Sequence, residues 1–239
     1  MATFVLVHGS RHGGWCWQRV GQRLLRAGHG AYWPTLTGCG DRSHLIDAMA
    51  IDLDTHIEDV AAALFYEDLK DVILVGHSYA GMVITGVADR SPERLARLVY
   101  LDALVPHAGE SHLQLAGEMA DGLRAQIAEE GRGTRLPAAT ASPGRYGVVD
   151  PDDAAWVAER LTDHPSGSLE QRLRSARHAY EMPRTYVSCR RSAMIPPSVA
   201  RRATDDPGFA VIELDAAHDC MITAPDLVVE TLLATAGAS

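Results

Sequence analysis

A serine in the stretch 76–81, GHSYAG, has surroundings that suit nucleophilic chemistry. An apolar run at 72–75 precedes it and a second apolar run at 82–88 follows it. A serine on a tight turn between a buried strand and a helix is typical of a nucleophile elbow, which raises the hydroxyl above the sheet. Ala80 replaces the second glycine of the usual G-x-S-x-G pattern, and Gly81 follows at once. We interpret Ser78 as a candidate nucleophile.

A serine nucleophile needs a base that takes its proton, and His218 is the candidate. The chain has 11 histidines, but His218 stands between the last expected strand, 209–212, and the last expected helix, 225–234. A histidine in that loop can reach over to the elbow.

An attacked carbonyl also needs backbone N–H groups that stabilise charge on its oxygen. The N–H of Tyr79 is one candidate because it begins the turn into the helix. The loop at 8–15, HGSRHGGW, follows the first expected strand, and its glycines permit close approach of the backbone. We assign the N–H of Ser10 as the second donor, with a loop that merely turns the chain as the alternative.

Strands and helices must alternate along the chain to position these groups. Short continuous apolar runs predict buried strands at 3–7, 31–33, 72–75, 95–101, 185–187 and 209–212. Apolar residues at helical spacing predict helices at 15–27, 55–66, 82–88 and 225–234. We therefore expect an α/β fold with a doubly wound, mostly parallel sheet.

The polar stretch 107–182 interrupts this alternation, and it contains helical patterns near 117–130, 152–161 and 168–180. We predict a core at 1–106 and 183–239, and a helical cap at 107–182 over the carboxyl ends of the strands, where such sheets bind ligands. Four cap residues would line a substrate pocket or pack within the cap: Met119, Tyr146, Trp156 and Tyr180.

Composition narrows the class of protein. The 239 residues carry a formal net charge of −9 and no basic cluster, which argues against nucleic acid and anionic membranes as partners. No apolar run approaches a membrane span, and we expect no signal peptide because the first residues lack a basic region and lead directly into an apolar run. The four cysteines lie far apart, so we expect free thiols, no metal site and a cytoplasmic monomer or homodimer.

Several motifs in order resemble the α/β-hydrolase superfamily. The stretches 5–10 (VLVHGS), 12–17 (HGGWCW) and 75–78 (VGHS), with the tail from His218 to Pro225, are similar to the branch that holds plant hydroxynitrile lyases and methyl-salicylate-type methylesterases. The resemblance covers essentially the whole chain and is weakest in the cap. It implies an α/β-hydrolase fold and a cofactor-independent serine esterase that acts on a small-molecule ester.

One position departs from that branch. The acid partner of the histidine belongs in the loop at 187–196, where Ser192 occupies the aspartate position and no carboxylate lies nearby. Asp102 closes the apolar strand 95–101, where a carboxylate is costly to bury without a partner. We predict that Asp102 completes a Ser78–His218–Asp102 triad, with Asp215 and Asp219 as weaker alternatives.

Two other function classes remain open at this stage. A carbon–carbon lyase or tailoring enzyme would keep the site, but hydroxynitrile lyases of the branch need a lysine after the histidine, where this chain has Asp219. A catalytically silent binding protein would explain Ser192 as the sign of a decayed triad. The residues that select the natural substrate cannot be assigned from the sequence.

Overall fold

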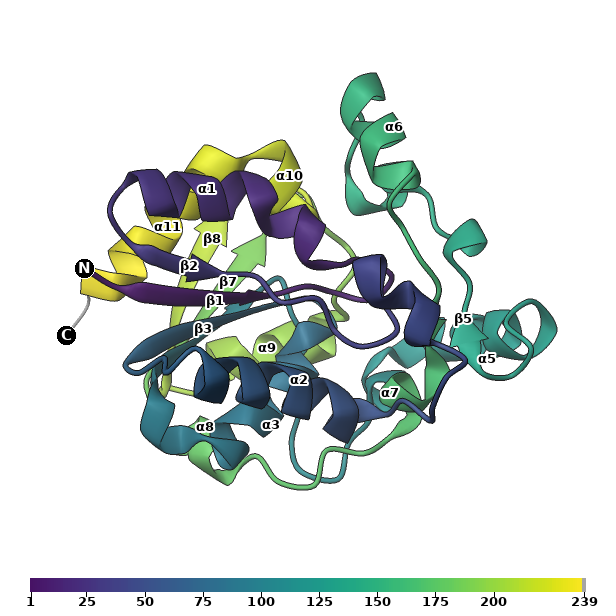
Figure 1. Cartoon of the computed structure of the whole chain (residues 1–239), viewed down its shortest axis with the longest axis horizontal. Helices are drawn as coiled ribbons and strands as arrows, with labels where there is room; N and C mark the ends of the chain where they lie inside the picture. The colour runs from purple at the N-terminus through teal and green to yellow at the C-terminus, as the bar shows by residue number, and fades with distance from the viewer. Residues whose placement is uncertain (238–239) are drawn as a thin grey trace.

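A six-stranded parallel sheet forms the centre of the computed structural model, which describes residues 1–237 (Figure 1). The strand order is β2-β1-β3-β4-β7-β8. The strands are β1 Thr3–Val7, β2 Gly30–Tyr32, β3 Val72–His77, β4 Leu95–Leu101, β7 Arg184–Cys189 and β8 Phe209–Leu214. From β1 the chain adds β2 on one side and β3 on the other, so the strand order reverses direction between β1 and β3. The carboxyl ends of the strands at such a reversal form the crevice where these sheets bind ligands.

Helices cover both faces of the sheet (Figure 1). One face carries α1 Gln18–Arg26, α10 Cys220–Thr223 and α11 Pro225–Gly237. The other carries α2 Leu53–Tyr66, α3 Ala80–Arg90, α8 Arg177–Glu181 and α9 Pro197–Asp205. Short 3-10 helices precede α1 at Gly14–Trp17 and β4 at Pro92–Arg94, and another spans Gly40–Leu45.

Alternate residues of each strand supply two separate apolar cores. In β1, Phe4 and Leu6 pack with the α1 side, whereas Val5 and Val7 pack with the α2 and α3 side. All four side chains are fully buried, as expected for a strand covered on both faces. The predicted doubly wound α/β-hydrolase fold is therefore confirmed.

The segment between β4 and β7 rises over one end of the sheet (Figure 1). It holds α4 His112–Leu115, α5 Ala120–Glu129, α6 Pro151–Ala158 and α7 Ser166–Glu170. It also holds 3-10 helices at Gly117–Met119, Ala138–Thr140 and Pro143–Tyr146, and a two-stranded antiparallel sheet of β5 Arg135–Leu136 and β6 His164–Pro165.

The helix expected at 168–180 is wrong as one element, because the chain leaves the helix at Gln171, whose backbone is extended. The reason lies in tertiary contacts. Leu173 exchanges backbone hydrogen bonds with the 109–110 segment, and the Gln171 side chain accepts the backbone N–H of Asp54 at 2.8 Å. Sequence periodicity does not register such partners.

No helix in the described part of the chain is both long and apolar enough to cross a membrane.

Candidate active site

The turn from β3 to α3 holds Ser78 in a left-handed backbone conformation, with φ of 57°. This conformation is uncommon outside glycine and marks a strained turn. The Ser78 N–H donates to the carbonyl of Leu101 at 3.4 Å, and the Ser78 carbonyl accepts the N–H of Leu104 at 3.0 Å. The elbow is therefore clamped by the end of β4.

Gly81 does what the second glycine of the usual pattern does: it lets the start of α3 come close to the backbone of Leu104. A Cβ at Gly81 would lie 1.9 Å from the carbonyl oxygen of Leu104, whereas Ala80 is buried without such a conflict. At the other end of the turn, a Cβ at Gly76 would lie 2.8 Å from the carbonyl oxygen of Ala80. The two small positions that this elbow needs are thus 76 and 81.

His218 and Asp102 meet although they are 116 residues apart in the chain. The Nδ1 atom of His218 lies 2.6 Å from Oδ2 of Asp102, and both residues are nearly inaccessible to solvent. Burial alone would raise the pKa of Asp102, but its hydrogen bond to His218 and the charge of that histidine hold the pKa below its ordinary value. The carboxylate is therefore ionised, Nδ1 carries the shared proton, and Nε2 of His218 is left as a base.

The backbone around Asp102 fixes where this carboxylate points. Asp102 has φ of 42°, and its N–H donates to the carbonyl of Val187 at 2.7 Å. The other carboxylate oxygen, Oδ1, accepts the N–H of Cys189 at 3.4 Å. The strand end thus turns toward β7, next to which the His218 loop lies.

Ser192 lies beside the same pair. Its Oγ is 3.5 Å from Nδ1 of His218, and it also forms a hydrogen bond with Asp102 that lowers the pKa of that carboxyl. The position at which the family carries its acid is therefore still within reach of the imidazole, with a hydroxyl in place of the carboxylate.

The two alternative acids lie elsewhere. Asp215 is mostly exposed and faces the guanidinium of Arg191 at 3.4 Å. Asp219 is fully buried, and its Oδ2 accepts from Nε2 of His12 at 3.0 Å. Neither carboxylate has a hydrogen bond to His218 within residues 1–237.

The loop after β1 packs directly against the elbow. A Cβ at Gly9 would lie 2.9 Å from the Cβ of Ser78, so only glycine lets the Ser10 backbone come this close. His8 accepts the N–H of Leu36 on Nε2 at 3.0 Å, so its Nδ1–H donates to the carbonyl of Gly9 at 2.8 Å. Burial lowers the pKa of His8 to about 3, which keeps this brace neutral.

His12 ties that loop to the residue after His218. Its Nδ1 lies 2.9 Å from the carbonyl oxygen of Ser10, while its Nε2 pairs with Asp219. Burial would lower the pKa of His12, but the charge and hydrogen bond of Asp219 outweigh burial and raise it. These contacts give His8 and His12 structural roles in holding the loop.

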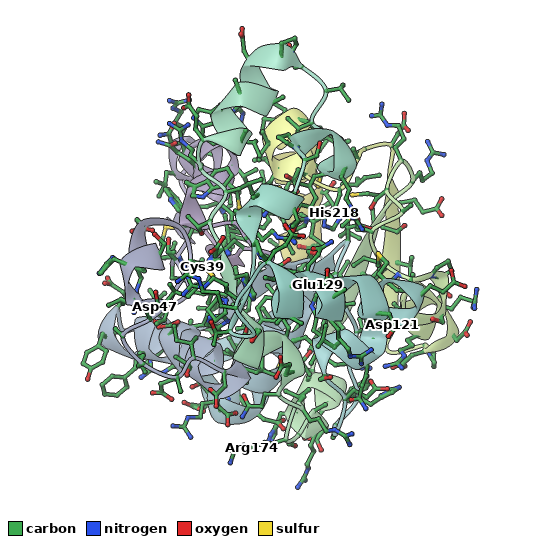
Figure 2. The ribbon with its side chains drawn as sticks, turned by 90° about the vertical axis from the view of Figure 1, so that its right-hand side faces the viewer. Cys39, Asp47, Asp121, Glu129, Arg174 and His218 are labelled. Atoms are coloured by element: carbon green, nitrogen blue, oxygen red, sulfur yellow. The ribbon has the colours of Figure 1, made fainter. Side chains whose placement is uncertain are left out.

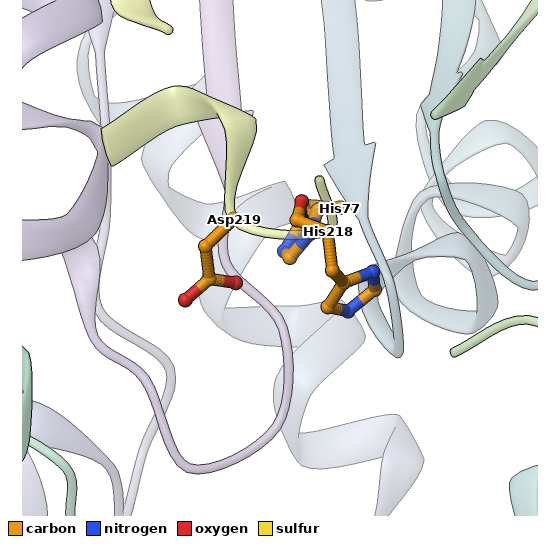
Figure 3. A group of neighbouring side chains, drawn as sticks. All are labelled: His77, His218 and Asp219. Atoms are coloured by element: carbon orange, nitrogen blue, oxygen red, sulfur yellow. Dashed lines mark hydrogen bonds between the residues drawn. The ribbon is translucent and has the colours of Figure 1, made fainter. Parts of the chain in front are cut away.

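His77, His218 and Asp219 form a compact group whose ligand atoms lie within 4.8 Å of one another (Figure 3). All three residues already have protein partners, and that of His218 is Asp102. The Nε2–H of His77 donates to the carbonyl of His218 at 3.0 Å, and Asp219 turns to His12. Burial lowers the pKa of His77 to about 3. We interpret the group as a hydrogen-bonded support for the His218 loop rather than as a metal centre.

A cavity of about 170 Å³ opens onto these groups, and Ser78, His218 and Ser10 all line it. Figure 2 looks onto the cap and shows His218 near the middle of the view, above helix α5, whose ends Asp121 and Glu129 mark. The cap supplies Met119 and Tyr146 to the cavity wall. A reacting group held here would contact both the elbow and the imidazole.

Comparisons with known proteins agree with this geometry. The model of the alpha/beta hydrolase family matches residues 4–231. The chain belongs to the alpha/beta hydrolase family. It is 37% identical over 245 residues to a carbendazim hydrolyzing esterase of Nocardioides sp. (strain SG-4G), covering 98% of this chain and 99% of that protein.

Two further relatives place this hydrolase within the family. An extracellular alpha/beta-hydrolase from a Paenibacillus species superposes with a TM-score of 0.86 at 25% identity over the whole of both chains. Methylesterase 10 of Arabidopsis thaliana is 33% identical over 107 residues, which are 44% of this chain and 38% of that protein. The predicted resemblance to the plant methylesterase branch is confirmed, and the relatives support carboxylic ester hydrolase activity.

Of the four cap residues for which pocket lining and cap packing were both open, two do not line the pocket of this hydrolase. Trp156 packs edge-to-face against Trp15 and lies under the guanidinium of Arg160, and the hydroxyl of Tyr180 donates to the carbonyl of Pro106 at 3.1 Å. Neither lines the cavity, because α6 and α8 turn these aromatic side chains toward the cap's own packing and the core.

Sequence reasoning missed other residues in the cavity wall, above all Arg11 and His112. Arg11 lies between Ser10 and His12 in a loop that the sequence already marked as close to substrate. The signal that could have found it is the single charged residue within a stretch rich in glycine and histidine.

Proposed function

We propose that this hydrolase cleaves a carboxylic ester of a small to medium-sized substrate through a covalent acyl-enzyme, without a cofactor. The observation that carries the proposal is the 2.6 Å contact between the buried Asp102 carboxylate and Nδ1 of His218, beside a cavity that also exposes Ser78. An orienting acid, a base and a hydroxyl on one wall form the arrangement that activates serine in acyl transfer.

In the first half of the reaction, Nε2 of His218 takes the proton of Ser78 as Oγ attacks the ester carbonyl carbon. Asp102 stabilises the imidazolium that forms. The N–H groups of Ser10 and Tyr79 would receive the charge on the carbonyl oxygen, and one such donor lowers the barrier by about 3 kcal/mol. Among residues 1–237, no hydrogen bond from either N–H to a protein acceptor competes with this role.

The imidazolium then gives its proton to the departing alcohol, and the acyl group remains on Ser78. A water molecule that loses its proton to Nε2 of His218 attacks the acyl carbon, and the collapse of the intermediate returns the proton to Ser78. The acid product leaves and the free enzyme is restored.

Substitution Ser78→Ala tests the proposal. We expect hydrolysis of 4-nitrophenyl acetate and labelling by a fluorophosphonate probe to fall to background, because the substitution removes the hydroxyl that forms the acyl-enzyme. The exposed Ser175→Ala serves as the matched control and should retain both signals. Undiminished turnover by the Ser78→Ala protein would contradict the proposed nucleophile.

A lyase reaction in the same cavity remains the second candidate, and the residue after His218 argues against its cyanohydrin form. That position is Asp219, and its carboxylate is already paired with His12 at 3.0 Å. Turnover of cyanohydrins with no turnover of simple esters would favour the lyase.

A further inference from the structure

The cavity beside Ser78 contains two arginines, Arg11 and Arg145, and no aspartate or glutamate. The chain as a whole has 31 acidic and 22 basic residues, with a formal net charge of −9. A pocket with only basic charges in an acidic protein has a potential opposite in sign to that of its surroundings, and it attracts anions.

Arg11 is buried with only 7% of its surface exposed, yet its hydrogen-bond acceptors are all uncharged. Its guanidinium donates to the carbonyl of Pro137 at 2.9 Å, to Oε1 of Gln126 at 3.0 Å and to Oγ1 of Thr140 at 2.7 Å. In residues 1–237, no carboxylate lies within 4.0 Å of it. A buried cation without a counter-charge is costly, so a ligand that supplied one would be bound favourably.

The backbone conformation at Arg11 also supports a role in ligand binding. Its φ of 64° is a left-handed conformation that glycine adopts readily and arginine does not. This strained conformation occurs one residue after Ser10. From there the Arg11 side chain reaches the cavity from below the cap. Arg145 approaches from the cap itself, and its guanidinium lies 3.7 Å from the sulfur of Met119.

The charge of Arg11 acts on the other groups of the pocket. Burial and, to a smaller extent, the charge of Arg11 lower the pKa of His112 to about 4, so His112 is neutral near pH 7 and adds no positive charge to the pocket. Part of the remaining wall is apolar, with Leu104, Leu136 and Ile195 among its residues. The cavity therefore suits a molecule with an apolar body and one negative group.

We propose that the natural substrate is an ester that also carries a carboxylate, and that Arg11, assisted by Arg145, binds that carboxylate while Ser78 attacks the ester. This inference rests on the proposed esterase function and names the substrate class of the same site. Arg11 would act in substrate binding and specificity through Nη1, because its Nε and Nη2 already donate to protein acceptors. A guanidinium N–H forms a strong, charge-assisted hydrogen bond with a carboxylate.

Two matched pairs of chromogenic or ultraviolet-detected esters test the inference. On the acyl side, 4-nitrophenyl hydrogen adipate is compared with 4-nitrophenyl hexanoate. On the alcohol side, 4-acetoxybenzoate is compared with 4-methylphenyl acetate. We expect kcat/KM to favour the carboxylate by about tenfold or more in at least one pair, as an ion pair in a partly dry pocket allows, and this preference to shrink with added salt. The pair that responds also shows which half of the ester the arginines face.

Arginine variants separate recognition from a structural role. Arg11→Gln should remove most of the preference, Arg11→Lys should retain part of it, and Arg145→Gln should reduce it by about threefold because this arginine is exposed. Arg124→Gln is the matched control, since Arg124 lies on the same cap outside the cavity and pairs with Asp121. If Arg11 only held the cap in place, its variants would lose activity on both esters of a pair equally, and that result would overturn the inference.

A binding measurement tests the anion site independently of the proposed esterase activity. The Ser78→Ala protein is titrated calorimetrically with 4-acetoxybenzoate and with adipate. Each titration is repeated on the Ser78→Ala/Arg145→Gln protein. Arg145 is exposed, so its substitution leaves the buried Arg11 and the loop after β1 unchanged. Anion binding that weakens in the double variant supports the site even if hydrolysis is absent. No preference in either ester pair, or anion binding unchanged by the Arg145→Gln substitution, would refute it.

Discussion

Asp102 and Ser192 both lie against Nδ1 of His218, at 2.6 Å and 3.5 Å. The carboxylate comes from the end of β4, whereas the hydroxyl stands at the position where the family carries its acid. Of the two side chains, Asp102 orients the imidazole far more strongly, because an ionised, buried carboxylate carries charge and a hydroxyl does not.

Asp102→Asn should therefore lower kcat by about 10³–10⁴-fold with the fold intact, because an amide favours the wrong tautomer of His218. Steady-state hydrolysis of 4-nitrophenyl acetate measures this loss, and the exposed Asp215→Asn is the control that should leave kcat within about twofold. Full activity of Asp102→Asn would show that the proposed acid is wrong.

Moving the carboxylate tests the geometry directly. In Asp102→Asn/Ser192→Asp, the new carboxylate would face the same Nδ1 from the neighbouring loop, and we expect a recovery of about tenfold or more over Asp102→Asn alone. No recovery in a well-folded double variant would mean that the 3.5 Å approach of Ser192 does not permit productive support.

Contacts between helices and loops that are distant in sequence hold the site together. The loop after β1 and the loop before α10 are joined by the buried His12–Asp219 pair, while α3 is pressed against the chain that follows Asp102 through Gly81. Both contacts join segments that are distant in sequence, so each carries part of the positioning of the groups around the cavity.

The His12–Asp219 pair should make stability depend on pH with a definite sign. Because the pKa of His12 is raised, its contribution is present below the ordinary value of 6.5 and is lost as pH rises through the raised pKa. Because the pKa of Asp219 is lowered, its contribution is present above 3.8 and is lost as pH falls through the lowered pKa. The pair is strongest between these two limits.

Asp219→Asn should accordingly lower the free energy of unfolding by about 2 kcal/mol near pH 5.5, with a smaller difference at alkaline pH. Denaturant titrations at several pH values measure this. Asp226→Asn, which disrupts an exposed pair with Arg23, should change stability little at any pH. A difference for Asp219→Asn that does not vary with pH would contradict the ionic character of the pair.

Gly81→Ala tests how closely α3 must approach the end of β4. A Cβ there would overlap the carbonyl of Leu104, so we expect a loss of about 2–3 kcal/mol of stability and reduced esterase activity as the elbow shifts. Gly122→Ala, in α5 with open space around its Cβ, should be neutral or stabilise by about 1 kcal/mol in thermal melts. Equal behaviour of the two variants would exclude the steric explanation.

Across the whole molecule, all four cysteines are buried. Cys16, Cys189 and Cys220 lie in the apolar core on the α1 side of the sheet, and Cys39 lies beside His164. Burial raises the pKa of the Cys16 and Cys39 thiols well above the ordinary range, which keeps them protonated and unreactive. Thiol reactivity therefore reports opening of the fold as a whole.

We expect the native protein to react very slowly with a thiol-specific disulfide reagent, and four thiols to react at once in denaturant. The native labelling rate should follow the unfolding equilibrium, because every thiol is enclosed. Rapid labelling of one cysteine without unfolding would show that part of the core opens on its own.

The sequence by itself determined the strand–helix alternation, the turn at Ser78 and the loop position of His218. Each of these depends on local chemistry: apolar runs predict buried strands, and a serine between strand and helix predicts an exposed hydroxyl. Asp102 was also predicted, since a carboxylate at the end of an apolar strand requires a partner.

Only the tertiary structure decided which distant groups meet. It brought Asp102 to 2.6 Å from His218, turned Asp219 to His12 and placed Arg11 under the cap among neutral acceptors. It also broke the helix expected at 168–180, through contacts with Asp54 and the 109–110 segment. Contacts between residues more than 50 positions apart leave no periodicity in the chain, so the charge of the pocket could be seen only after folding.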